Sequence, residues 1–258
     1  MKKTIISCVL FLTAVTAFSQ TPMKTAAEAK LSASDLAVKI ADRILATTTY
    51  EFKNTKTGKT YKSVKNLPVD MNVKVACKYN NWHYTNGVTH IALMELADKT
   101  GAKKYDDYVF KNMNFVFNEG NLDFFKKQYD QAMKDEVLYG VRKLSWHMIF
   151  RGKRLDDNGP MGASLIDLQM KHPNNSFLNY INETAEHLNY GEPRLADGTI
   201  ARIWPHENTI WADDAFMAIS FLARMAKMTG DMSYINDAAN QVIKYHKYLW
   251  CPEKRILY

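Results

Sequence analysis

Apolar residues follow helical spacing in three successive pairs of segments, which begin at Asn86, Asn158 and Asp213. A short turn divides each pair. Glycine relieves the left-handed strain where a helix ends, and Asp or Asn then starts the next helix. The pattern therefore predicts three helical hairpins. Their turns are Thr100-Gly101-Ala102, His172-Pro173-Asn174 and Thr229-Gly230-Asp231.

In the later two hairpins the first helix is apolar nearly all round and rich in small residues, as at 161–163 and 215–218. A helix of this kind is buried on both sides. The second helices carry a polar face, for example at Asn236 and Asn240. An inner helix paired with an outer helix, repeated along the chain, predicts an all-α toroid of helical hairpins. An open helical solenoid is the alternative.

Three segments precede the hairpins. Residues 20–34 are polar and are expected to form a flexible tether. A helix is expected from about Asp35, capped by Ser34 or by Asp35 itself. Residues 51–81 are rich in Lys, Asn and Thr and indicate little regular structure. The predicted helical domain covers residues 35–258.

The first nineteen residues have the pattern of a signal peptide. Lys2 and Lys3 precede an apolar run from residue 5 to residue 15, and small residues follow before Gln20. Cys8 lies inside the apolar run, which excludes a lipoprotein signal. The pattern predicts an exported protein, periplasmic or secreted, that is cleaved before Gln20. A buried N-terminal helix is the alternative.

The composition limits the classes of partner that are expected. The net charge is +7, but acidic and basic residues interleave and no nucleic-acid-binding motif accompanies them, so nucleic acid is not expected. No later run is long and apolar enough for a membrane span. Cys77 and Cys251 could pair in an oxidising compartment or could be small buried residues, and no cysteine spacing typical of zinc occurs.

The inner helices of such a toroid start at the same end, so the residues around those starts are expected to meet. Aromatic rings stack on sugars and carboxylates hold hydroxyl groups, which makes this a candidate sugar pocket. Alternatively, the acids only stabilise helix N-termini, although that role explains one acid per helix and not a doublet. The converging residues are Trp82, His83, Asn86, Asp156, Asp157, Trp211, Asp213 and Asp214.

Three segments resemble glycoside hydrolase family 105, the unsaturated rhamnogalacturonyl hydrolases, which is related to family 88, the unsaturated glucuronyl hydrolases. The segments are WHYTNGV at 82–88, LDDNGPMGASL at 155–165 and IWADDAFMAISFLARMAKMTGD at 210–231. The resemblance implies an (α/α)6 barrel. It also implies removal of a 4,5-unsaturated galacturonic or glucuronic acid from the non-reducing end of oligosaccharides made by polysaccharide lyases. The family acts by hydrating the C4=C5 double bond, so one carboxyl group serves as acid and base in turn.

The same resemblance implies roles for individual residues. Asp213 matches the catalytic aspartate, and Asp156 matches a second aspartate that holds ring hydroxyls and tunes the acid. Asp214 is expected to support the helix N-terminus. The residues expected to line or bind the sugar are Trp82, His83, Asn86, Asp157, Trp204, His206, Trp211 and Asp214 itself. Alternatively, Trp82, His83, Trp204 and Trp211 belong to the core, and His206 is a histidine of a surface loop. No metal and no cofactor is expected, and the oligomeric state is left open.

The chain departs from the family's pattern at its C-terminal end. It carries about seven of the twelve helices expected of a complete barrel. No Trp-Arg-Gly-Trp segment, which completes the family's pocket, follows. The chain is therefore expected to be an incomplete copy of such an enzyme. The alternatives are an inactive remnant, a carbohydrate-binding helical-repeat protein, and a helical scaffold that binds another protein.

Overall fold

The computed structural model describes residues 32–117, 120–135, 146–152 and 154–257. The signal peptide expected at residues 1–19, and nearly all of the tether expected at residues 20–34, lie outside the described residues. The chain divides into two units, one up to residue 43 and one from residue 44 onward.

α2 (Ala33–Thr47) begins two residues earlier than expected. Its cap is Ser32, and not Ser34 or Asp35. The Ser32 hydroxyl accepts a hydrogen bond from the Asp35 backbone N–H at 3.1 Å, and the Asp35 carboxylate accepts one from the Ser32 backbone N–H at 3.1 Å. This reciprocal pair satisfies two free donors at the helix start.

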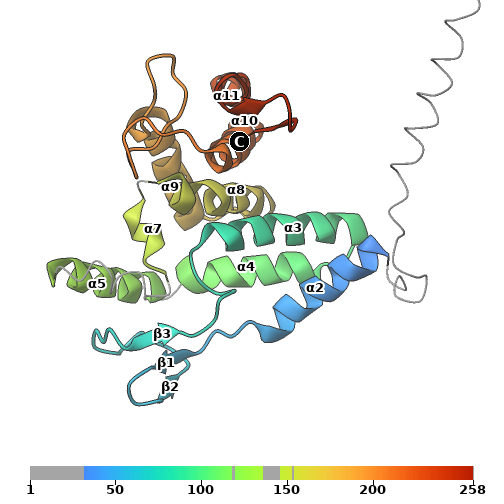
Figure 1. Cartoon of the computed structure of the whole chain (residues 1–258). Helices are drawn as coiled ribbons and strands as arrows, with labels where there is room; N and C mark the ends of the chain where they lie inside the picture. Colours follow the sequence, from blue (N-terminus) through green and yellow to red (C-terminus); the bar gives the residue numbers. More distant parts are fainter. Residues whose placement is uncertain (1–31, 118–119, 136–145, 153, 258) are drawn as a thin grey trace, which may run out of the picture. The chain divides into compact units, whose positions relative to one another are not determined.

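The three predicted hairpins are present, and they dominate the second unit (Figure 1). Gly101 and Gly230 end the first helices of two hairpins with φ of 70° and 76°, the left-handed conformation that glycine adopts without strain. Asn174 and Asp231 cap the return helices as expected. The hairpins are α3 (Tyr84–Thr100) with α4 (Lys104–Phe117), α8 (Leu155–Lys171) with α9 (Asn175–Glu186), and α10 (Ala212–Thr229) with α11 (Met232–Leu249).

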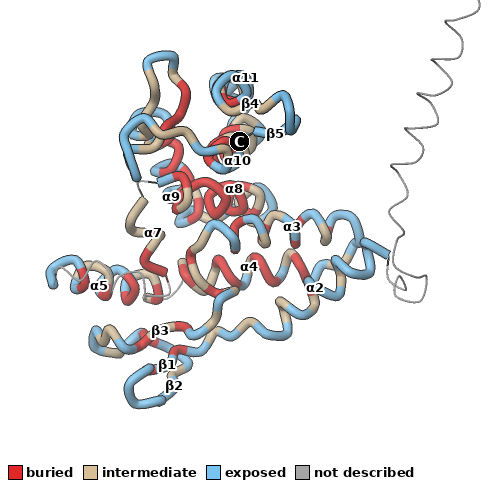
Figure 2. The backbone as a smooth tube through the Cα atoms, viewed as in Figure 1, coloured by how far each residue is buried: buried red, intermediate tan, exposed pale blue. Residues whose placement is uncertain are grey.

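The first helices pack side by side, with α8 between α3 and α10. α8 is buried along most of its length (Figure 2). Glycines permit the close approach: a Cβ atom at Gly159 would lie 2.6 Å from the Met217 carbonyl of α10, and one at Gly87 would overlap the Pro160 backbone. The expectation that small residues crowd the inner helices together is confirmed.

Residues 51–81 contain more regular structure than expected. β1 (Phe52–Asn54) pairs antiparallel with β2 (Thr60–Tyr61) and with β3 (Val73–Val75). Phe52 at the centre is fully buried and stacks on Phe115 of α4, with ring centroids 5.4 Å apart. The sequence pattern missed this sheet because its strands are only two or three residues long.

The remaining elements join the hairpins. α5 (Asn121–Lys134) and the short α7 (Met148–Arg151) lie between the first and second hairpins in the chain. A π-helical turn, η1 (His187–Gly191), extends α9. A small hairpin of β4 (Trp250–Cys251) and β5 (Ile256–Leu257) follows α11.

Two further observations concern the described residues. Cys77 and Cys251 are both free thiols, so the disulfide left open above does not form. Among the helices that the structure describes, none has the length and apolar character needed to cross a membrane.

Candidate functional site

The start of α8 presents two neighbouring aspartates to different surroundings. Arg154 precedes the helix with extended backbone, and Asp156 and Asp157 occupy its first turn. Asp157 is fully buried, and its carboxylate accepts two hydrogen bonds from Arg151, at 2.5 and 2.6 Å. The Asp156 side chain is 28% exposed and contacts Arg202. Burial raises the pKa of Asp157, and the hydrogen bonds from Arg151 act against that rise.

The start of α10 repeats this arrangement. Asp214 is 1% exposed, and its carboxylate accepts hydrogen bonds from Arg202 at 2.5 and 2.7 Å. Asp213 beside it is half exposed. Burial raises the pKa of Asp214 and Arg202 opposes that rise. Because a guanidinium group keeps its proton in proteins, this two-point contact fixes Asp214 as the anionic partner.

Arg202 joins the two helix starts. Its Nη2 atom lies 3.3 Å from Asp156 Oδ1 and 3.6 Å from Asp213 Oδ2, in addition to its bonds with Asp214. Its guanidinium carbon lies 4.2 Å from the ring centroid of Trp211, within range of a cation–π interaction. Burial disfavours the charge of Arg202, but the hydrogen bonds and charges of the aspartates outweigh burial and raise its pKa.

The loop between η1 and α10 holds Arg202 in place. Backbone hydrogen bonds join Arg202 to Thr209 in both directions, at 2.7 and 3.2 Å. The Ile200 backbone N–H, nearby, donates to the Gln241 side chain of α11 at 3.0 Å. These bonds join the two halves of the loop to each other and the loop to the outer helix α11. They hold the Arg202 guanidinium group over the starts of α8 and α10.

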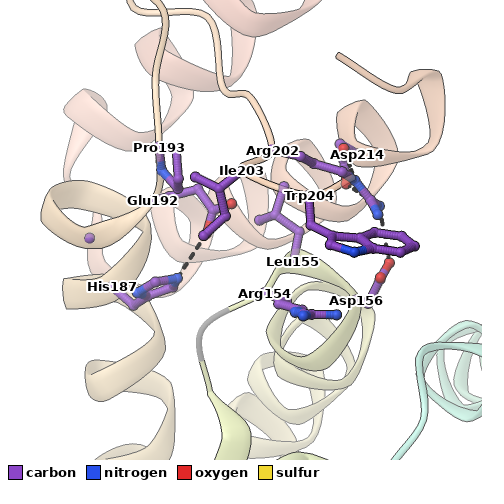
Figure 3. Close-up of a pocket in the computed structure, with 11 residues that line it drawn as sticks. Arg154, Leu155, Asp156, His187, Glu192, Pro193, Arg202, Ile203, Trp204 and Asp214 are labelled. Carbon is purple, nitrogen blue, oxygen red and sulfur yellow. Dashed lines mark hydrogen bonds and ion pairs between the residues drawn. The ribbon is translucent and has the colours of Figure 1, made fainter. Parts of the chain in front are cut away.

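A pocket opens beside this cluster (Figure 3). Its cavity volume is about 180 Å³, below the roughly 300–1,000 Å³ common for complete small-molecule sites. Figure 3 shows His187 and Glu192 on one side and Asp156, Arg202 and Trp204 on the other. The lining residues are Arg154, Leu155, Asp156, His187, Gly191, Glu192, Pro193, Arg202, Ile203, Trp204 and Asp214.

Some predicted residues lie at this pocket and others lie near it. Asp156, Asp214 and Trp204 line it. Asp213 and Trp211 contact Arg202 but are not among the lining residues. The structure thus brings the two predicted catalytic aspartates to one guanidinium group, as the convergence of the helix starts requires.

Other predicted residues lie inside the fold. Trp82 is 2% exposed, and its indole N–H donates to the Asp157 carbonyl at 2.7 Å. Asn86 is 4% exposed and donates to the Lys78 and Asn81 carbonyls at 3.0 and 3.1 Å. Trp82 and the buried Asp157 support the start of α8, whereas Asn86 holds the segment before α3. The contact of these residues with a sugar stays a prediction.

The two predicted histidines differ. His83 caps α3, and its ring nitrogen accepts a hydrogen bond from the Thr85 backbone N–H at 3.3 Å. Burial lowers the pKa of His83, while the charges of Asp156 and Asp157 act in the opposite direction, which places His83 close to the aspartates. His206 lies exposed in the loop before α10 and does not line the pocket.

The sequence interpretation missed three side chains that build the site, His187, Glu192 and Arg202, and it missed Arg151, which holds the buried Asp157. Their contacts join segments with no shared periodicity, so no spacing in the sequence indicates them. Within the described residues, no group of three or more His, Cys, Asp or Glu side chains has the arrangement of a metal site.

Comparison with known proteins places this arrangement in a class. The fold of inner and outer helices with an acidic pocket at the helix starts is that of an α/α-hairpin barrel. The sequence profile of Glycosyl Hydrolase Family 88 matches residues 59–258, and the chain belongs to that family. No curated protein shows significant sequence similarity to the chain.

Solved structures show the same fold. One is described as a possible member of the GH105 family from Klebsiella pneumoniae, with TM-score 0.55 and 14% identity over 88% of this chain and 50% of its own. Another, from Salmonella enterica serovar Paratyphi A, has TM-score 0.51 and 16% identity over 88% and 51%. A family 105 glycoside hydrolase of C. acetobutylicum has TM-score 0.54 and 20% identity over 88% and 48%. The chain spans about half the length of these structures.

Proposed function

We propose that this chain carries the acidic half of the active site of a glycoside hydrolase. Its substrate is an oligosaccharide with a 4,5-unsaturated galacturonic or glucuronic acid at the non-reducing end, of the kind that polysaccharide lyases release. Membership of family 88 supports a hydrolase. The observation that carries the assignment is the contact of Arg202 with both Asp156 and Asp213 at the edge of one pocket.

In the proposed reaction Asp213 acts first as acid and then as base. Its carboxyl group gives a proton to C4 of the double bond, and water adds to C5 and returns a proton to the same carboxylate. The resulting hemiketal opens and releases the rest of the oligosaccharide. Asp213 is suited to this cycle because its side chain is half exposed and so can meet substrate and water.

Asp156 is proposed to hold sugar hydroxyls, and Arg202 to fix the spacing of the two carboxyl groups. Three carboxyl groups face one guanidinium group here. Of the three, Asp213 has the most exposed side chain, at 52%, against 28% for Asp156 and 1% for Asp214.

The test follows the ultraviolet absorbance of the C4=C5 double bond in lyase products. The wild-type chain is expected to remove this absorbance, and Asp213→Asn to slow its removal by about a hundredfold or more. Asp167→Asn is the matched control, because Asp167 pairs with Arg224 away from the pocket. Retained activity in Asp213→Asn, or an equal loss in Asp167→Asn, would sink the assignment of the catalytic residue.

A second candidate is sugar binding without hydrolysis. One observation favours it: Asp213 lies outside the set of residues that line the pocket. It predicts that calorimetry detects binding of the unsaturated disaccharide by the wild-type chain while the absorbance stays constant. Removal of the absorbance by the wild-type chain eliminates this candidate.

A further inference from the structure

Glu192 and His187 form a second polar group in the pocket, and the proposed reaction does not use it. The two side chains lie on the wall that faces Asp156, Arg202 and Trp204 (Figure 3). His187 Nε2 and Glu192 Oε2 are 2.8 Å apart, a hydrogen-bond distance. The Glu192 side chain is only 5% exposed.

The backbone around η1 builds this pair. The chain turns through a π-helical step in which the Glu192 backbone N–H donates to the His187 carbonyl at 2.8 Å. This wide turn returns the Glu192 side chain to the His187 ring. A Cβ atom at Gly191 would lie 2.6 Å from His187 Nδ1, so a glycine there gives the ring its place. Such π-helical turns are frequent at functional sites.

One oxygen of Glu192 has no partner within the part of the chain that the structure describes. Oε2 meets His187, whereas Oε1 forms no hydrogen bond with any described residue. Oε1 is not among the buried side-chain atoms that lack a partner, so it is open to solvent in the pocket. A ligand in the pocket can supply the missing partner.

The surroundings of Glu192 favour its neutral form. Burial raises its pKa to about 8, and the charge of Asp214 adds to that rise, as does the charge of Asp156 more weakly. Arg194 and Arg202 act in the opposite direction. The titratable or charged groups that face it are Asp156 of α8, His187 of η1, Arg194 and Arg202 of the loop, Asp214 of α10 and Tyr245 of α11.

We propose that Glu192, oriented by His187, donates a hydrogen bond through Oε1 to an oxygen of the acidic sugar bound beside Asp156 and Arg202. In this arrangement His187 donates from Nε2 to Oε2, which leaves the proton of Glu192 on Oε1 and directed at the ligand. A protonated Glu192 carries no charge and can therefore lie beside a sugar carboxylate, whereas an ionised Glu192 would repel it. The inference rests on the proposed function only for the identity of the ligand.

The experiment measures binding of the lyase-derived unsaturated disaccharide by calorimetry at pH 6.5 and pH 9. Wild-type affinity is expected to fall by about tenfold between these values, because Glu192 loses the donated proton and gains a charge as the pH rises through about 8. Glu192→Gln keeps a donor and cannot ionise, so it is expected to bind well at both values. Glu192→Met loses the donor and is expected to bind about tenfold more weakly at pH 6.5.

Glu183→Gln provides the matched control. Glu183 is an exposed carboxylate of α9 that does not line this pocket, so its variant should keep the wild-type pH dependence. A decline with pH that persists in Glu192→Gln overturns the inference. Wild-type affinity in Glu192→Met, or a wild-type chain that does not bind the disaccharide at either pH, also overturns it.

A measurement on the wild-type chain alone tests the inference even if the variants fail to fold. At pH 8 the free protein holds the Glu192 proton about half of the time, and the bound protein holds it fully. Binding should therefore take up part of a proton, which calorimetry detects in buffers of different ionisation enthalpy. Absence of uptake contradicts the inference. Because none of these readouts needs turnover, binding without loss of absorbance refutes the hydrolase and leaves this inference standing.

Discussion

The aspartate doublets at the starts of α8 and α10 have the same local arrangement but differ in the contacts that their arginines make. In each doublet the second aspartate is buried and held by two hydrogen bonds from an arginine. Arg151 comes from the short α7 and meets Asp157. Arg202 comes from the loop before α10 and meets Asp214, but it also reaches Asp156 and Asp213.

The difference shows how one motif can serve either structure or a site. A buried carboxylate needs a charged partner wherever it lies, because an unpaired charge in the interior is costly. At Asp157 the partner fixes the start of α8 in the interior. At Asp214 the buried carboxylate holds Arg202 at the pocket, so that its remaining donors face the exposed aspartates of both helices.

Removing the two arginines is expected to give the largest effects. Arg151→Met and Arg202→Met should each lower the free energy of unfolding by about 3–5 kcal/mol, since each leaves a buried carboxylate unpaired. Urea denaturation measures this loss. Among molecules that remain folded, Arg202→Met should also weaken binding of the unsaturated disaccharide by about tenfold or more, whereas Arg151→Met should leave the affinity nearly unchanged.

Arg224→Met is the control for the loss of an arginine. Arg224 pairs with Asp167 across α10 and α8, away from the pocket, and both side chains are 21% exposed. The expected loss of stability is at most about 1 kcal/mol. If folded Arg151→Met lost as much affinity as folded Arg202→Met, the division between a structural and a site arginine would be wrong.

A buried histidine sharpens the comparison because its ring forms no hydrogen bond with any described residue. His90 of α3 is 1% exposed, and neither ring nitrogen has a hydrogen-bond partner within the described residues. Burial lowers its pKa to about 4 from 6.5. Between pH 6.5 and pH 4 the unfolded state therefore binds a proton at His90 that the folded state does not bind. The contribution of His90 to the free energy of unfolding is fully present above pH 6.5 and is lost as the pH falls toward 4.

This shift corresponds to up to about 3 kcal/mol of stability lost over that window. His90→Leu is expected to remove that part of the pH dependence, as measured by urea denaturation from pH 7 to pH 4. The exposed His206 gives the control His206→Gln, which should follow the wild-type curve. A His90→Leu curve that falls as steeply as the wild-type curve would contradict the prediction.

The features that could be predicted from the sequence are those encoded by local patterns. Helical periodicity and the turns at Gly101 and Gly230 fix the hairpins, and small residues such as Gly159 indicate the crowded inner helices. Once the inner helices are aligned, their starts must meet. The convergence of Asp156 and Asp213 follows from that alignment, because no sequence pattern pairs the two residues directly.

The features that could not be predicted depend on contacts between segments without periodicity. Arg202 is placed by backbone bonds to Thr209, and the sequence gives no sign of that pairing. Glu192 meets His187 because the backbone makes a π-helical turn, which helical periodicity does not encode. Trp82 packs beneath the start of α8, and a tryptophan in an apolar pattern does not by itself distinguish a pocket wall from a core.

Trp211 gives the smallest expected effect. Its ring stacks on Arg202, and its side chain is partly open to solvent, so the contact contributes about 0.5–1 kcal/mol. Trp211→Leu should therefore lower the affinity for the disaccharide by about threefold, since Arg202 is held less firmly over Asp156 and Asp213. Trp250→Leu is the control, because Trp250 is similarly exposed and stacks on His246 instead. Equal affinities in the two variants would mean that the aspartates alone hold Arg202 in position.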